Sequence, residues 1–338
     1  MANESLISTD IDYTQSGKQI GVLRVPQSFN TAGWANYFIP IAVIQNGSGP
    51  TVLLSGGNHG DEYEGQVTLL NLVREIQPEQ VQGRLIVLPM LNRPACVAGT
   101  RLSPLDGRNM NRAFPGQRND TITGMIAHYV SSVLLPLADI VVDIHSGGRT
   151  LQFLPSVNMH ELANQTQMDE MVRAANSWGA PYVFIYADVA GEGLLPSYAE
   201  SLGKITLGTE LGSAPQFGVE MLGIADRGVK NMLRMYGVLT DSPYTPPAPA
   251  PQLVAATDAA DYVMAPVSGI FEPFLEMGDS VEVGQKLGQI HSTELPFADP
   301  VPVLAQTGGI LFGRCGFPLT QQGACVATIV RPYTLPKE

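Results

Sequence analysis

The chain has 338 residues, a length at which two domains are more usual than one. Hydrophobic residues make up 44% and charged residues 15%, as in ordinary globular proteins, and the net charge of −12 argues against a surface for nucleic acid or anionic membranes. The chain has only three cysteines, and none of them has CxxC spacing. We therefore expect neither a disulfide framework nor a zinc knuckle. We expect a cytoplasmic protein with no signal peptide and no membrane span.

Before residue 240, short apolar runs alternate with helical patterns. This alternation predicts an α/β fold with a mostly parallel sheet covered by helices on both faces. The first 45 residues are expected to form strands and turns that lead into it. The expected strands are 51–57, 83–92, 139–148 and 204–212, and the expected helices are 64–76, 125–138 and 168–179.

The clearest break in the chain is "DSPYTPPAPAPQ" at 241–252, where five prolines exclude a helix or a central strand. We therefore predict a catalytic domain at 1–242, a linker at 243–252 and a second domain at 253–338. The second domain has short strands punctuated by glycines and no helical period, which indicates a small all-β unit.

A histidine and a carboxylate three residues apart follow the first apolar run, in "SGGNHGDEYEGQ". His59 and Glu62 would face the same side of a turn, and His145 closes another apolar strand in "DIVVDIHSGG". Sites in open α/β sheets form at the carboxyl ends of strands, and two histidines with one glutamate are a known catalytic zinc set. A polar turn and a capping histidine are the ordinary alternatives, but the shared setting of all three residues favours a metal site.

The other three histidines are predicted to be structural or solvated. His128 lies in a helical stretch, whereas His160 and His291 lie in polar surroundings. Asp143, two residues before His145 on the same strand face, would orient that ligand or merely cap the strand.

A loop rich in turn formers carries arginines and asparagines, in "GTRLSPLDGRNMNRAFPG" at 99–116. Arginine forks bind carboxylates, so this loop suggests an anionic group on the substrate, although a solvated basic loop explains it equally well. Glu210, at the end of "KITLGTELG", is either a solvated strand-end residue or a general base in a closed cleft.

Four motifs in this order, "GGNHGDEYEG", "DGRNMNRAFPG", "DIHSGG" and "TLGTELG", resemble the succinylglutamate desuccinylase/aspartoacylase family. That family belongs to the zinc carboxypeptidase-like superfamily, and the resemblance covers roughly residues 50 to 240. The opening motif and the C-terminal unit are most similar to the branch that contains the N-acetyl-diaminobutyrate deacetylase of ectoine breakdown.

The resemblance implies a role for each matching residue. His59, Glu62 and His145 fall on the ligands of one Zn²⁺ per chain. Asn111 and Arg112 fall on the pair that holds the substrate carboxylate.

Two further positions match the catalytic groups of the family. Arg101 falls on the arginine that stabilises the oxyanion, and Glu210 on the base that assists attack by zinc-bound water. Arg108 and Asn109 receive no role. A tyrosine that covers the substrate cannot be aligned, and Tyr244 and Tyr262 are only guesses.

The C-terminal unit resembles a barrel-sandwich domain of the biotinyl/lipoyl type. Its nearby lysine, Lys286, lies within a strand rather than at a hairpin tip, so we predict a non-carrier domain. In the family such a domain restricts entry to the cleft.

The implied function is a zinc deacylase for a small N-acyl amino acid, of the acetyl or succinyl type. A zinc carboxypeptidase for short peptides and a non-catalytic zinc-binding protein remain as alternatives. No nucleic-acid or membrane partner is expected, and assembly into a homo-oligomer is left open. Iron, cobalt or manganese in place of zinc is also left open by the ligand types.

Overall fold

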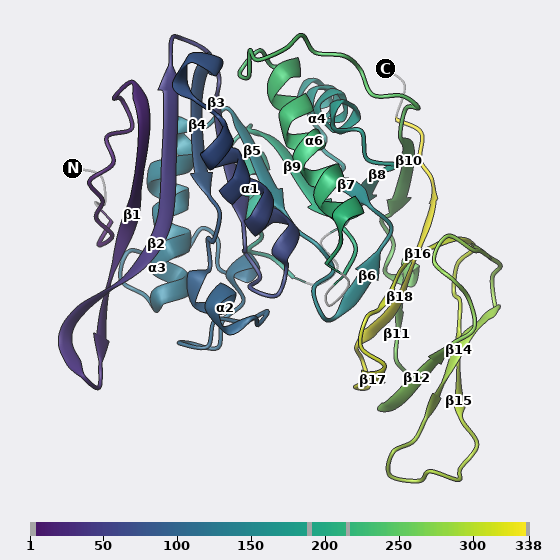
Figure 1. Ribbon diagram of the computed structural model, residues 1–338. Helices are drawn as coiled ribbons and strands as arrows, with labels where there is room; N and C mark the ends of the chain where they lie inside the picture. Colours follow the sequence, from purple (N-terminus) through teal and green to yellow (C-terminus); the bar gives the residue numbers. More distant parts are fainter. Residues whose placement is uncertain (1–4, 188–190, 214–216, 336–338) are drawn as a thin grey trace.

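The computed structural model describes residues 5–187, 191–213 and 217–335. Its centre is a large mixed sheet in which neighbouring strands follow the order β1-β2-β4-β3-β5-β9-β7-β8-β10-β18-β16-β13 (Figure 1). The part before residue 240 supplies β1 (Gly17–Phe29), β2 (Ala32–Asn46), β3 (Thr51–Gly56), β4 (Gly83–Leu88), β5 (Ile140–Ile144), β6 (Leu151–Phe153), β7 (Ser156–His160), β8 (Tyr182–Tyr186) and β9 (Ile205–Glu210). The predicted α/β class is confirmed.

Parallel pairing dominates the middle of this sheet. β3 pairs in parallel with β4 and β5, β5 with β9, and β8 with β7 and β10, whereas β7 runs antiparallel to β9. All residues of β3 and β5 are buried, since helices cover both faces. This explains their uninterrupted apolar runs.

Two groups of helices cover the two faces of the sheet. On one face α1, α4 and α6 pack together over a core of aliphatic residues, and they lie in front of the sheet in Figure 1. On the other face lie α3 and α5. The helices are α1 (Tyr63–Glu75), α2 (Arg93–Ala98), α3 (Ile122–Tyr129), α4 (Gln165–Trp178), α5 (Leu195–Ser201) and α6 (Val219–Met235).

The expected helix over 125–138 differs from the structure. α3 begins at Ile122 and ends at Tyr129, and the chain continues as a π turn to Leu134 and a 3₁₀ turn at Leu135–Leu137. Pro136 in this last turn lacks the N–H that a continuing α-helix requires. No helix among the described ranges is both long and apolar enough to cross a membrane.

Up to residue 335, the C-terminal part contains strands and one short 3₁₀ turn as its regular elements. Its second, four-stranded sheet has the order β15-β14-β12-β17, and Lys286 lies at the start of β14. The strands are β10 (Gln252–Ala256), β11 (Tyr262–Met264), β12 (Gly269–Pro273), β13 (Ser280–Val281), β14 (Lys286–His291), β15 (Val301–Leu304), β16 (Gly309–Cys315), β17 (Leu319–Thr320) and β18 (Cys325–Pro332).

The main sheet continues across the proline-rich segment. β10, which begins at Gln252, pairs in parallel with β8 and antiparallel with β18. β6, which lies before residue 240, pairs with β16. The predicted division at 243–252 stays a prediction, but the parts on either side share one hydrogen-bonded sheet.

Phe312 on β16 lies at the centre of the apolar cluster that joins these two parts. Its side chain is fully buried, and its ring centroid lies 4.8 Å from that of Phe184 and 5.6 Å from that of Tyr182. We expect Phe312→Ala to lower the free energy of unfolding by about 3–5 kcal/mol, because the cavity left there is lined by both parts. Denaturant unfolding measures this change. Phe297→Ala, at a fully exposed phenylalanine, is the control, and equal losses in both variants would contradict the argument.

Candidate active site

The carboxyl ends of β3 and β5 bring the predicted metal ligands together. The two strands are parallel neighbours with Gly56 opposite Ile144, so the loop after β3 and the residue after β5 meet at one edge. His59 and Glu62 lie in that loop, with Glu62 immediately before α1, and His145 directly follows β5. This is the edge at which open α/β sheets place their sites.

Two imidazole nitrogens converge on one carboxylate. His59 Nδ1 lies 2.8 Å from Glu62 Oε1, and His145 Nδ1 lies 2.7 Å from Glu62 Oε2. The three residues are buried and each offers a ligand atom within 4.8 Å of the others. Two imidazoles and one carboxylate fit a catalytic zinc ion, which leaves a further position open for water or substrate.

Glycine at position 60 lets the metal-site loop pack tightly on α2. A Cβ there would lie 2.0 Å from the carbonyl carbon of Ala95, and Gly60 N–H donates to Thr100 O over 2.9 Å. Any larger residue would displace the segment between His59 and Glu62. The glycine that directly follows His59 therefore has a packing reason.

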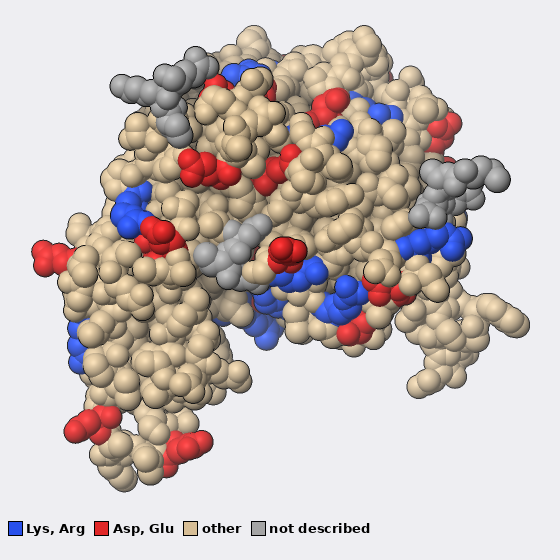
Figure 2. Space-filling view, turned by 180° about the vertical axis from the view of Figure 1, so that it is seen from behind, with Lys and Arg blue, Asp and Glu red and all other residues tan. Residues whose placement is uncertain are grey.

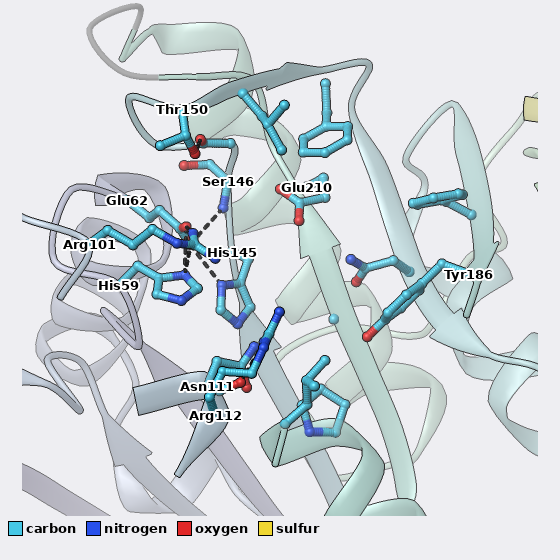
Figure 3. Close-up of a pocket in the computed structure, with 18 of the residues that line it drawn as sticks. His59, Glu62, Arg101, Asn111, Arg112, His145, Ser146, Thr150, Tyr186 and Glu210 are labelled. Carbon is cyan, nitrogen blue, oxygen red and sulfur yellow. Dashed lines mark hydrogen bonds and ion pairs between the residues drawn. The ribbon is translucent and has the colours of Figure 1, made fainter. Parts of the chain in front are cut away.

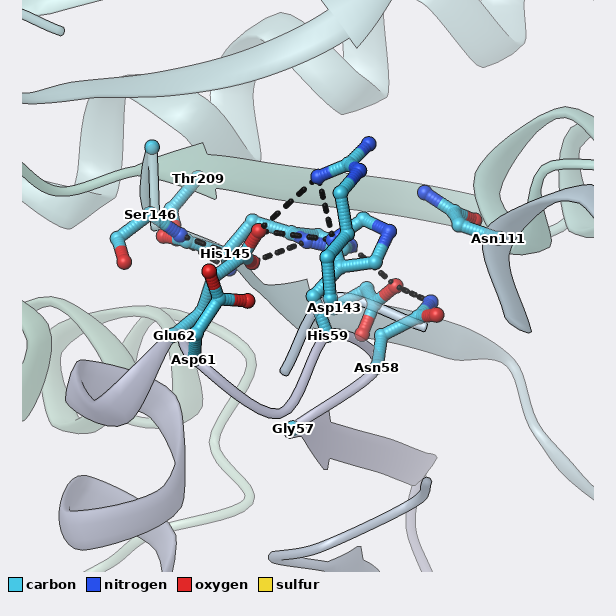
Figure 4. Close-up of polar contacts among 12 residues, drawn as sticks. Gly57, Asn58, His59, Asp61, Glu62, Asn111, Asp143, His145, Ser146 and Thr209 are labelled. Carbon is cyan, nitrogen blue, oxygen red and sulfur yellow. Dashed lines mark hydrogen bonds and ion pairs between the residues drawn. The ribbon is translucent and has the colours of Figure 1, made fainter. Parts of the chain in front are cut away.

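A buried carboxylate contacts His145 at Nε2, the ring nitrogen that does not face Glu62. Asp143 Oδ2 lies 2.8 Å from His145 Nε2, and Asp143 is fully buried (Figure 4). Ser55 Oγ donates to Asp143 Oδ1 over 2.6 Å, and Asn58 Nδ2 donates to Oδ2 over 2.7 Å. These contacts fix the ring so that Nδ1 faces Glu62, which is the arrangement of an oriented metal ligand.

The arginine–asparagine loop borders the same cavity (Figure 3). Arg101 Nη1 lies 3.3 Å from His59 Nδ1 and 3.6 Å from Glu62 Oε1. Arg112 Nη1 donates to the carbonyl of Asn111 over 2.6 Å. All three predicted loop residues line the cavity, whereas Arg108 is bound to the carboxylate of Asp120 at 2.9 Å.

Glu210 ends β9 and lines the same cavity as the arginine loop. Its Oε2 is buried and has no hydrogen-bond partner in the described part of the chain. Burial raises the pKa of Glu210 to about 8, and the negative charge of Glu62 adds to the shift. A carboxylate whose pKa lies near neutral can both take and return a proton.

Aromatic side chains also line the cavity, which has a volume of ≈180 Å³. Phe153 and Phe184 come from the part before residue 240, and Tyr262 comes from the C-terminal part. The Tyr262 hydroxyl donates to the carbonyl of Ala256 over 3.0 Å. Tyr244, the other tyrosine considered, lies outside the described lining residues.

Several lining residues gave no signal in the sequence. Asn158 and Tyr186 line the cavity from β7 and β8, two strands that we did not predict. His160, predicted to be structural or solvated, is buried with Nδ1 2.6 Å from Glu200 Oε2.

Comparison with known proteins agrees with this geometry. The protein-family model for the succinylglutamate desuccinylase/aspartoacylase catalytic domain matches residues 48–236 of this chain. The N-alpha-acetyl-L-2,4-diaminobutyric acid deacetylase of Halomonas elongata is 39% identical over 310 residues, which is 92% of this chain and 90% of that protein.

The chain belongs to the succinylglutamate desuccinylase/aspartoacylase family. It is therefore an enzyme from a family of deacylating hydrolases that act on amides.

Solved structures of family members share the whole architecture. A succinylglutamate desuccinylase/aspartoacylase from Rhodobacter sphaeroides is 41% identical with a TM-score of 0.92, covering 98% of this chain and 100% of that one. The product-bound ectoine utilization protein EutE (DoeB) from Ruegeria pomeroyi is 35% identical with a TM-score of 0.92, covering 97% and 99%. The family fold thus includes the C-terminal β part.

Proposed function

We propose that this enzyme removes a small acyl group from an N-acyl amino acid, and that N-acetyl-diaminobutyrate is the first substrate to test. The observation that carries the proposal is the meeting of a three-ligand metal set, a base of raised pKa and an Asn–Arg pair around one small cavity. The similarity to the Halomonas elongata deacetylase supports the choice of acyl group and amino acid.

His59, Glu62 and His145 would hold one Zn²⁺ ion. When bound, zinc supplies Lewis acidity, which polarises a carbonyl and lowers the pKa of water. Zinc is the proposed metal because imidazole and carboxylate ligands suit it.

The side chains of this enzyme perform the remaining steps. Asn111 and Arg112 hold the carboxylate of the amino acid, so that the amide lies between Arg101 and Glu210. Glu210 takes a proton from the attacking water, and Arg101 stabilises the negative charge that develops on the acyl oxygen. Glu210 then donates the proton to the nitrogen of the leaving amine, which completes the cleavage.

The size of the cavity favours a small substrate over a peptide. Sites for drug-sized ligands usually have volumes of about 300–1,000 Å³. The cavity here has ≈180 Å³, and Tyr262 of the C-terminal part is one of the residues that line it. A carboxypeptidase must also accommodate the peptide that precedes the scissile bond. Because the cavity is small, carboxypeptidase activity is the second candidate function.

A release assay tests the substrate class. Zinc-loaded enzyme is offered N-acetyl and N-succinyl amino acids, N-acetyl-diaminobutyrate among them, with free amine as the readout. We expect release from N-acetyl-diaminobutyrate that a chelator stops, and little release from the N-succinyl series. Release from short peptides alone would replace the deacylase with a carboxypeptidase. Confirmed zinc binding without any release would favour a non-catalytic role.

The other partners and the location stay predictions. Basic side chains lie close to acidic ones on the face shown in Figure 2, which supports the expectation that nucleic acid is not a partner. A homo-oligomer is tested by light scattering, and the cytoplasmic location by cell fractionation. The uncharged tip of the β1–β2 hairpin, where Trp34 is 99% exposed, is one surface available for self-association.

A further inference from the structure

Asn109 contacts a predicted metal ligand, although no role was predicted for this residue. Its Oδ1 lies 3.0 Å from His59 Nε2, on the ring edge opposite Nδ1. Because Oδ1 of an amide only accepts, His59 must donate from Nε2 in this contact. This contact leaves Nδ1 as the nitrogen that faces Glu62 and that would bind a metal.

The two histidines are held by groups of different charge. The Nε2 atom of His145 contacts the fully buried carboxylate of Asp143, and the Nε2 atom of His59 contacts the neutral amide of Asn109. A carboxylate behind a metal-binding histidine makes the ligand more basic, and an amide orients the ring with less effect on basicity. His145, which contacts a carboxylate, is therefore the more basic of the two proposed histidine ligands, and His59 is the less basic.

The same amide oxygen also contacts the turn that carries Asn111 and Arg112, the pair proposed to bind the substrate carboxylate. Asn109 Oδ1 accepts the backbone N–H of Asn111 over 2.9 Å and caps the 3₁₀ turn Met110–Arg112. The side chain of Asn111 in turn accepts the N–H of Leu195 at the start of α5 over 2.9 Å. One acceptor thus joins a metal ligand to the loop that binds the substrate.

We propose that Asn109 is a positioning residue that sets the tautomer and orientation of His59 and ties this ligand to the Asn111–Arg112 turn. This inference rests on the proposed metal site. Asn109 does not contact the reacting atoms, so it acts through His59. The neutral amide limits the basicity of His59, and a carboxylate in its place strengthens metal binding.

The test measures zinc affinity rather than turnover. Metal-free wild type, Asn109→Ala and Asn109→Asp are titrated with zinc in competition with a chromophoric chelator. The alanine variant should bind zinc about 10- to 100-fold more weakly, which is the usual effect of removing a group that orients a metal ligand. The aspartate variant keeps both acceptor contacts and should bind zinc more tightly than the wild type.

Asp106→Ala is the matched control. Asp106 lies in the same loop and accepts from Thr123 N and Thr123 Oγ1 over 3.0 and 2.9 Å, away from His59. Zinc affinity in this control should equal that of the wild type. The proposal is overturned if Asp106→Ala weakens zinc binding as much as Asn109→Ala does, or if Asn109→Asp binds more weakly than the wild type. The second comparison holds even when the alanine variant does not fold. A wild-type chain that binds no zinc would instead overturn the metal site itself.

Discussion

The Glu210→Gln variant is expected to turn over the substrate about 10² to 10⁴ times more slowly than the wild type, because it loses the group that moves the proton. Glutamine has nearly the same shape as glutamate but neither accepts nor returns a proton at neutral pH. Zinc stoichiometry should stay at one per chain, since Glu210 is not among the three converging ligands. Single-turnover kinetics with metal analysis on the same sample measures both quantities.

Glu220→Gln provides the control for the loss of one carboxylate. Glu220 lies in the exposed first turn of α6, and its substitution should leave turnover unchanged. If Glu210→Gln keeps wild-type turnover with full zinc occupancy, Glu210 is not the base and the proposed mechanism is wrong. If the variant loses zinc as well, Glu210 supports the metal site rather than the proton transfer.

Removal of the metal is expected to reduce activity to background, and one equivalent of zinc should restore it. His145→Ala should show the same loss without restoration, because it removes one of three ligands and leaves Asp143 without its histidine partner. We expect its zinc affinity to fall by more than the roughly 10- to 100-fold that follows loss of an orienting group. Chelator competition and amine release measure the two effects.

His128→Ala is the matched control for His145→Ala, since His128 lies on α3 and does not line the cavity described here. It should keep both zinc and activity. Activity that survives complete removal of the metal would contradict the metal-dependent mechanism while leaving the family assignment intact.

The cluster of His59, Glu62 and His145 was predictable because its residues follow buried parallel strands. Such strands are read from uninterrupted apolar runs, and their carboxyl ends must meet at one edge. His59 and His145 could therefore be placed near each other without a structure. Proposing them as metal ligands required the family resemblance, since one histidine and one carboxylate at this spacing are common in turns.

The part of the cavity that is lined from β7, β8 and the C-terminal part was not predictable in the same way. β8 pairs with β10, although α5 and α6 separate the two strands in sequence. Alternation along a strand shows which side chains share a face but does not name the neighbouring strand. The contact between Asn109 and His59 depends likewise on loop conformation, which no periodicity encodes.

The parallel pairing of β8 with β10 bears on any attempt to isolate the catalytic part. A chain cut after the proline-rich segment begins would leave the N–H and C=O groups along one side of β8 without partners. It would also uncover Phe184, which is buried against Val254 and Phe312 in the intact chain. Unpaired strand edges with apolar neighbours promote aggregation. A shortened relative would need another segment to cover this edge, so loss of the C-terminal part in evolution must be accompanied by a replacement strand or a subunit contact.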